Sequence, residues 1–87
     1  MLYKITRDGG HEVTLRTARP QAAVSRWLGL GPALRREHTL SASRDGGETW
    51  RACVVDITPA GKDCHATISD GDETGPDLVW QGWIFGK

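Results

Sequence analysis

Two short stretches with the same glycine-rich centre decide the fold: TRDGGH at residues 6–11 and SRDGGE at residues 43–48. Apolar and polar residues alternate on either side of each stretch, as they do in half-buried strands. Aspartate followed by two glycines favours a tight chain reversal, because glycine readily adopts the positive φ angles that hairpin loops need. We therefore predict two β-hairpins, each closed by a three-residue Asp-Gly-Gly loop.

The loop length also predicts which residues face each other across each hairpin, since every added loop residue shifts the pairing. A two-residue loop would set Ile5 against Glu12 or Thr14, so the three-residue loop is preferred. The expected partners in the first hairpin are Ile5 with Val13 and Tyr3 with Leu15. Those in the second hairpin are Ala42 with Trp50 and Leu40 with Ala52.

The segment between the hairpins is predicted to be a short helix over residues 17–29. Pro20 suits its first turn, where the missing amide proton is not needed, and Gly29 suits its end. The apolar residues that share one face are Val24, Trp27 and Leu28. This face is expected to pack against the sheet, and residues 31–36 then form a connection with room for one helical turn.

The second half of the chain is predicted to add further strands. Residues 49–57 are apolar on both faces, as in a central strand, and residues 58–61 resemble a type I turn with a glycine bulge. Two more strands are expected over residues 63–69 and 78–85. The elements together predict one α+β domain, residues 1–87, in which a twisted, mainly antiparallel sheet of five to six strands carries one short helix on one face.

The composition is that of an ordinary globular protein, with 38% hydrophobic and 25% charged residues. The alternating start of the chain, residues 1–7, lacks the apolar stretch of a signal peptide. No run approaches the roughly 18 apolar residues of a membrane-spanning helix. We therefore expect a cytoplasmic protein without membrane contact.

Residues 43–50 also resemble the Asp-box hairpin of sialidases and other β-propellers. The pattern Ser-x-Asp-x-Gly-x-Thr-Trp is complete at Ser43, Asp45, Gly47, Thr49 and Trp50. A propeller needs at least about four sheets of four strands, so the resemblance implies a local brace and no sialidase activity. Within this brace we expect Asp45 to accept hydrogen bonds from turn amides and Trp50 to pack under the turn.

The charges are divided unequally along the chain although the net charge is zero. Residues 1–51 contain nine Lys/Arg and five Asp/Glu, whereas residues 52–87 contain two and six. Basic residues gather around the predicted helix and its exit, where guanidinium groups suit phosphate or carboxylate partners. The candidate partner-binding residues are Arg16, Arg19, Arg26, Arg35 and Arg36. The alternative is that these charges form a solvent-facing surface without a partner.

An acidic loop late in the chain gives a second candidate contact surface. Its members are Asp70, Asp72, Glu73 and Asp77. Carboxylates at alternate positions resemble the start of a calcium-binding loop, but Gln81 stands where a ligating glutamate is needed, and Pro76 opposes the helix that should follow. We expect an acidic loop without a metal, which would meet a partner by imitating the negative charge of a nucleic acid.

No combination of residues predicts catalysis or a bound cofactor. Cys53 and Cys64 are expected to be free thiols, because the predicted register of their hairpin sets them on opposite faces of the sheet. The histidines, His11, His38 and His65, are scattered, and no Ser, Cys or Asp is placed beside one of them in a way that predicts a nucleophile. The Cys64-His65 pair lacks a second ligand pair at zinc spacing. The expectation is a non-enzymatic protein with no metal and no cofactor.

A small α+β domain of this kind is expected to act by stoichiometric binding. In architecture it resembles the small inhibitors encoded by phages and mobile elements, including anti-CRISPR proteins, and the resemblance implies that it blocks a host nucleoprotein complex by occlusion. The partner is then a protein or nucleoprotein, direct nucleic-acid contact stays open, and the chain is a monomer or weak dimer. Two alternatives remain: a nucleic-acid-binding regulator that uses the arginines, and a glycan-binding module that uses Trp80 or Trp83, which fall on opposite faces of the last strand.

Overall fold

The computed structural model describes residues 1–9, 13–70 and 77–85, and it confirms the α+β class. The described elements are β1 (Leu2–Arg7), β2 (Val13–Thr17), α1 (Pro20–Gly29), α2 (Gly31–Arg35), β3 (His38–Ser43), β4 (Arg51–Ala60), β5 (Asp63–Asp70) and β6 (Asp77–Ile84). The connection after α1 does contain a helical turn, α2. None of the described helices is long and apolar enough to cross a membrane.

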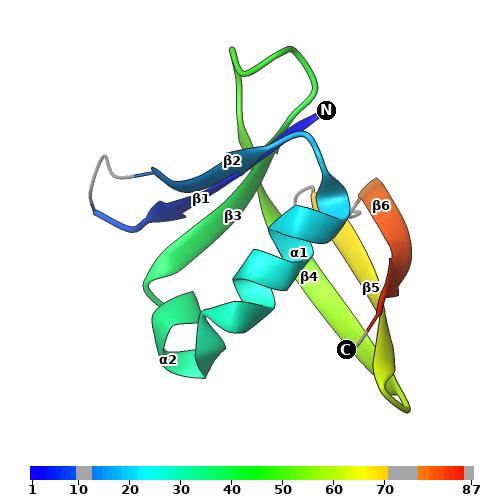
Figure 1. Cartoon of the computed structure of the whole chain (residues 1–87). Coiled ribbons are helices and arrows are strands. Elements are labelled where there is room, and N and C mark those ends of the chain that lie inside the picture. The colour runs from blue at the N-terminus through cyan, green and yellow to red at the C-terminus, as the bar shows by residue number, and fades with distance from the viewer. Residues whose placement is uncertain (10–12, 71–76, 86–87) are drawn as a thin grey trace.

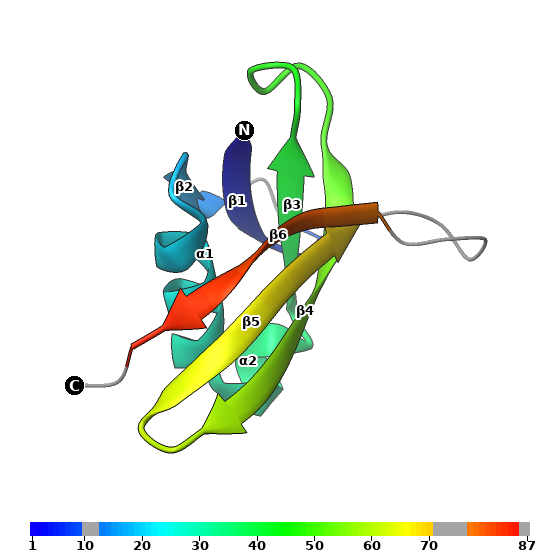
Figure 2. The ribbon, with the colours of Figure 1, turned by 90° about the vertical axis from the view of Figure 1, so that its right-hand side faces the viewer.

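The six described strands form one antiparallel sheet in the order β2-β1-β3-β4-β5-β6. The sheet is strongly twisted, so that β5 and β6 run obliquely across the direction of β1 and β3 (Figure 2). α1 lies on one face of the sheet, between the β1–β2 hairpin and β6, and α2 follows at its end (Figure 1). The opposite face of the sheet is therefore left without a helix.

The core fills the space between α1 and the sheet. Its buried hydrophobic residues are Tyr3, Ile5, Ala23, Val24, Leu40, Ala42, Ala66 and Ile68. Trp27 and Leu28 of α1 pack against this cluster, as their predicted position on one helix face requires. Pro20 occupies the first turn of α1 and Gly29 ends it, while a φ of 78° at Gly31 lets the chain turn directly into α2.

The first hairpin forms, but its predicted register is wrong by two residues. Ile5 pairs with Leu15 instead of Val13, and Tyr3 pairs with Thr17 instead of Leu15, with a bulge beside Ile5. A shift of two residues keeps every side chain on its original face, so the hydrophobic pattern cannot detect it. Part of the expected Asp-Gly-Gly loop lies outside the described residues.

In the second hairpin the predicted register is wrong by one residue. Ala42 pairs with Arg51 instead of Trp50, and Ala52 pairs with Ser41 instead of Leu40. The loop between β3 and β4 therefore contains seven residues rather than three. A seven-residue loop forms because Asp45 accepts hydrogen bonds from Ser43 and Thr49, on both sides of the turn, so that the residues between β3 and β4 do not pair as strands.

This one-residue shift in register moves every side chain of β4 to the opposite face of the sheet from the one that was predicted. The residues that pack on the core are Cys53, Val55 and Ile57. Val54, which the alternation would have placed with Trp50 on a buried face, is 61% exposed. The prediction that this strand is buried on both faces is therefore wrong, because α1 covers only one of them.

The hairpin between β4 and β5 turns later than predicted. The expected turn at residues 58–61 is mostly strand, since Ala60 still pairs with Asp63. Only Gly61 and Lys62 form the reversal, and Gly61 takes a φ of 69°. The sheet gains length at this end, which lengthens the exposed face of β4 and β5.

The two cysteines are free, as predicted, but the reason given by the predicted register is wrong. Cys53 lies opposite Asp70 and Cys64 lies opposite Pro59, so both thiols are on the same face of the sheet. What separates them is distance along the strand, about 20 Å for the six residues from Cys53 to Pro59. A disulfide cannot span this separation.

Candidate anion-binding surface

The loop between β3 and β4 folds into a closed, hydrogen-bonded brace. Asp45 accepts hydrogen bonds from the Thr49 amide at 2.9 Å, from the Thr49 hydroxyl and from the Ser43 hydroxyl. The Ser43 oxygen accepts a further bond from the Gly47 amide at 2.9 Å. Trp50 donates its indole N–H to the Gly47 carbonyl at 3.1 Å. Asp45 and Trp50 thus make the contacts expected of a local brace.

These contacts keep Asp45 ionised. The hydroxyl and the amide of Thr49, followed by the Ser43 hydroxyl, hold the pKa of Asp45 well below its usual range. The carboxylate oxygens of Asp45 already accept three hydrogen bonds within the loop. The brace is therefore structural, and it fixes the position of Trp50 at neutral pH.

Trp50 lies on the outer face of the sheet, where two basic side chains approach its ring. The Lys4 Nζ is 4.3 Å and the Arg16 Cζ is 5.6 Å from the ring centroid. Lys4 and Arg16 are cross-strand partners on β1 and β2. They face away from the core, because Tyr3 and Ile5, on either side of Lys4, are buried. Contacts of this kind contribute about 0.5–1 kcal/mol each at exposed sites.

Gly47 gives Arg16 the space to lie over the loop. A Cβ atom at Gly47 would be only 2.6 Å from the Arg16 Nη2, and the φ of 101° at Gly47 already disfavours other residues. The brace thus sets the position of the guanidinium through both Gly47 and the Trp50 ring. We call this local unit, composed of Lys4, Arg16, Gly47 and Trp50, the cationic platform.

The five arginines predicted to bind a partner do not form one patch. Arg19 is exposed at the N-terminal end of α1, three residues beyond Arg16 of the platform. Arg26 is exposed about 10 Å further along α1. Arg35 and Arg36 lie at the end of α2. In the described part of the chain, no ion pair is formed by Arg16, Arg19, Arg26 or Arg36.

Arg35 differs from the other four because it is half-buried. Its Nε is shielded from solvent and has no hydrogen-bond partner among the described residues. The aliphatic stem of such an arginine contributes packing as well as charge. Reversal of its charge would therefore disturb α2 as well as the surface, and we place the contact surface at the other end of the helices.

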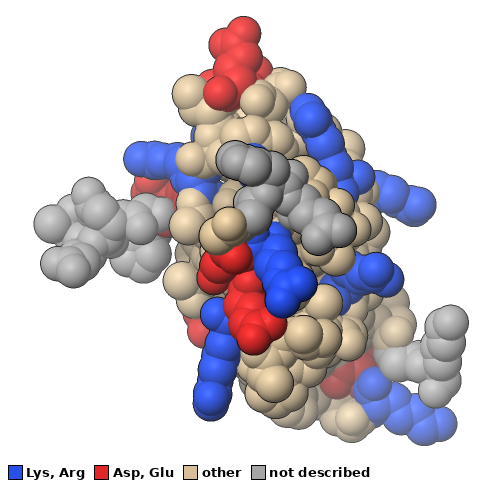
Figure 3. Space-filling view, turned by 90° about the vertical axis from the view of Figure 1, so that its left-hand side faces the viewer, with Lys and Arg blue, Asp and Glu red and all other residues tan. Residues whose placement is uncertain are grey.

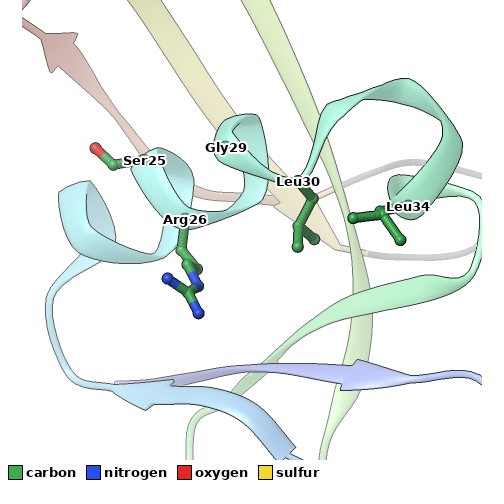
Figure 4. A pocket seen from close by; sticks show the side chains of 5 residues that line it. All are labelled: Ser25, Arg26, Gly29, Leu30 and Leu34. Carbon is green, nitrogen blue, oxygen red and sulfur yellow. The ribbon is translucent and has the colours of Figure 1, made fainter.

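An open cavity of about 380 Å³ beside α1 and α2 is lined by Ser25, Arg26, Gly29, Leu30 and Leu34. Leu34 points toward Leu30, whereas Ser25 points away from both (Figure 4). Arg26 is the one charged residue of this lining. The cavity lacks the convergent polar groups that orient a small ligand, so it does not define a second site.

Asp70, the first residue of the acidic-loop alternative, does not lie on an exposed surface. This residue is 2% exposed, and Arg44 donates hydrogen bonds to its two oxygens at 2.5 and 3.3 Å. Arg51 approaches the same carboxylate at 3.9 Å. The prediction that Asp70 belongs to an exposed contact loop is wrong, because burial requires a carboxylate to be neutralised by neighbouring groups. Asp77 is exposed, and Asp72 and Glu73 lie outside the described residues.

Two ionisable groups near Asp70 have raised pKa values. Burial and the nearby Asp70 carboxylate raise the pKa of the Cys53 thiol to about 11. Burial also raises the pKa of Tyr3. Both groups are protonated at neutral pH, whereas a catalytic nucleophile needs the opposite shift. Within the described ranges, no group of three or more His, Cys, Asp or Glu side chains is placed to hold a metal ion.

On the side of the molecule that Figure 3 shows, the described basic residues do not form a uniformly basic surface. Figure 3 shows basic side chains spread over one side of the molecule with acidic side chains between them. Arg7 and Glu37, for example, approach within 3.9 Å of each other. On this side, recognition by charge would depend on a local group of basic residues.

Lys4 and the position of Trp50 are the parts of this surface that sequence reasoning missed. Lys4 is one of two basic residues in β1, and nothing near it in the sequence points to Trp50. The available signal was the Asp-box pattern at residues 43–50, whose complete hydrogen bonding requires a loop longer than three residues.

Comparison of the chain with known protein families, with curated proteins and with solved structures finds no match.

Proposed function

We propose that the protein is a non-enzymatic binding protein that docks its cationic platform, together with Arg19, on an anionic surface of a partner. The observation that carries the proposal is the convergence of Lys4 and Arg16 on Trp50. Two cations held this close repel each other, and no described carboxylate pairs with either one. An incoming anion would supply the missing charge at a site that is already formed, which lowers the cost of binding.

The partner that we propose is a cytoplasmic protein or nucleoprotein, which the chain blocks by stoichiometric occlusion. A sequence isoelectric point near 6.8 and a net charge of zero disfavour a nucleic-acid-binding regulator, since such domains carry a strong excess of positive charge. A small basic site on a neutral molecule suits one specific docking surface instead. An inhibitor of the anti-CRISPR kind, acting on a host nucleoprotein complex, is the narrower form of this proposal.

The general proposal is tested by capture from cell lysate with the tagged chain, followed by quantitative mass spectrometry with and without nuclease treatment. The double variant Arg16→Glu, Arg19→Glu should lose the partner. Lys62→Glu, a single charge reversal in the exposed turn between β4 and β5, should retain it. Circular dichroism establishes that both variants fold, and equal recovery by both would contradict the proposal.

The narrower form has an assay of its own. Cells with an active CRISPR–Cas system express the chain and are challenged with a targeted phage. Restored plaque formation, lost again in the Arg16→Glu, Arg19→Glu variant, is the expected result. Absence of restoration with every CRISPR type tried would reject the anti-CRISPR form and leave the capture experiment to decide the general one.

A further inference from the structure

The outer face of β4, β5 and β6 is covered by no described element, since both helices lie behind the sheet (Figure 2). Trp83 is 47% exposed on this face. Trp80, three residues earlier on the same strand, packs against the core on the other face. The predicted division of these two tryptophans between the faces of the last strand is thus confirmed, and Trp83 is the exposed one.

His65 holds the Trp83 ring in place. The two residues are cross-strand partners on β5 and β6. Their ring centroids are 5.3 Å apart and their planes meet at 74°, which is an edge-to-face contact. The indole is therefore restrained while nearly half of its surface stays exposed. A restrained ring loses little conformational entropy when a ligand stacks on it.

A row of polar side chains lies next to Trp83 and crosses three strands. Asp56 of β4, Thr67 of β5 and Gln81 of β6 occupy the same level of the sheet. The row faces outward, because Ala66 and Ile68, on either side of Thr67, are buried on the opposite face. Given the spacing of strands and of alternate residues, the ring and the row span about 10 Å by 7 Å.

The chemistry of this surface suits an uncharged ligand that is rich in hydroxyl groups. The polar row offers a carboxylate, a hydroxyl and an amide, which between them donate and accept hydrogen bonds. The described outward positions of β4, β5 and β6 contain no lysine or arginine, so the surface does not favour a phosphate. An exposed indole stacks on the C–H face of a pyranose ring, whose hydroxyls then reach the polar row.

We propose that the outer face of β4 to β6 at Trp83 binds a neutral saccharide of one or two rings. This site is separate from the cationic platform, which lies on β1, β2 and the β3–β4 loop. It does not depend on the function proposed above, because neither Lys4 nor Arg16 contributes to it. The carboxylate of Asp56 would orient the ligand by accepting hydrogen bonds from adjacent sugar hydroxyls.

The test uses a glycan array that carries neutral, sialylated and sulfated oligosaccharides, followed by NMR titration of the indole N–H signals with the best neutral binder. The wild-type chain should bind at least one neutral oligosaccharide, and Trp83→Ala should weaken that binding at least tenfold. Gln81→Ala, at an exposed position, should weaken it several-fold without affecting the fold. Leu34→Ala removes an exposed apolar side chain from α2 and serves as the matched control.

Three results would overturn this inference: no neutral oligosaccharide bound at millimolar concentration, undiminished binding by Trp83→Ala and Gln81→Ala, or binding of sulfated and sialylated glycans only. The last result would point to the cationic platform instead. The Arg16→Glu, Arg19→Glu variant separates the two proposals, because it should lose the anionic partner and keep the neutral saccharide.

Discussion

Replacing Gly47 by alanine should damage the cationic platform in a way that replacing Gly46 should not. Both glycines have positive φ angles, 101° at Gly47 and 74° at Gly46, so alanine is strained at either position. The surroundings differ. A Cβ at Gly46 would meet nothing within 4 Å, whereas a Cβ at Gly47 would lie 2.6 Å from the Arg16 Nη2.

The expected magnitudes follow from these two terms. Left-handed backbone costs a residue with a Cβ about 1–2 kcal/mol, and the φ of Gly47 lies further from the favoured left-handed region than that of Gly46. Displacing Arg16 from Trp50 forfeits a further 0.5–1 kcal/mol or so of cation–π attraction. Gly46→Ala should therefore lower the melting temperature by roughly 5–10 °C and Gly47→Ala by roughly 10–20 °C.

The contribution of Arg16 is isolated by a double-mutant cycle. Urea unfolding followed by circular dichroism gives the free energy of unfolding for Gly47→Ala and Gly46→Ala, each with Arg16 and with Arg16→Ala. We expect Gly47→Ala to cost about 0.5–1 kcal/mol less when Arg16 is absent, and Gly46→Ala to cost the same in both backgrounds. A coupling energy of zero between Gly47 and Arg16 would refute the platform geometry.

Three further outcomes are expected. Because hydrogen bonds lower the pKa of Asp45, the ionised carboxylate stabilises the fold above the unfolded-state pKa of about 4, and this stabilisation is lost as the pH falls below that value. Asp45→Asn should therefore lower the melting temperature at pH 7, and the melting temperature of this variant should fall less between about pH 5 and pH 2 than that of the wild-type chain. Ile68→Ala, at a fully buried position, should cost about 2–5 kcal/mol, while Val54→Ala on the exposed face should cost well under 1 kcal/mol, as thermal unfolding will show. With a pKa of about 11, Cys53 should be labelled by a thiol reagent at pH 8 far more slowly in the folded than in the unfolded chain. Dithiothreitol should leave the melting temperature unchanged, and a lower melting temperature in dithiothreitol would show that Cys53 and Cys64 are bonded.

The order and type of the elements could be predicted from the sequence, because alternation, turn residues and the proline and glycine that bound α1 are local signals. The registers could not. The first hairpin differs from its prediction by two residues, a change that leaves the faces of the sheet unaltered. The second differs by one, because hydrogen bonds to Asp45 lengthen the loop and carry Trp50 out of β4.

The candidate anion-binding surface could likewise be predicted only in part from the sequence. Composition and position along the chain could identify basic residues around α1, but they could not show that Arg35 is half-buried or that Asp70 is neutralised by Arg44. Lys4 joins the surface only because β1 lies between β2 and β3 and brings it under Trp50. Contacts between residues this far apart depend on the register, which local sequence signals leave undetermined.

The proposed contact with an anionic partner consists of the cationic platform and Arg19. Its most direct measurement is calorimetric titration of the purified chain with the partner that it captures, at low and at moderate salt. We expect a saturable one-to-one complex whose affinity falls as the salt concentration rises. Arg16→Glu, Arg19→Glu should weaken this complex at least tenfold, and Lys62→Glu should leave its affinity unchanged. Equal affinity of the wild-type chain and the double variant at both salt concentrations would contradict this proposal.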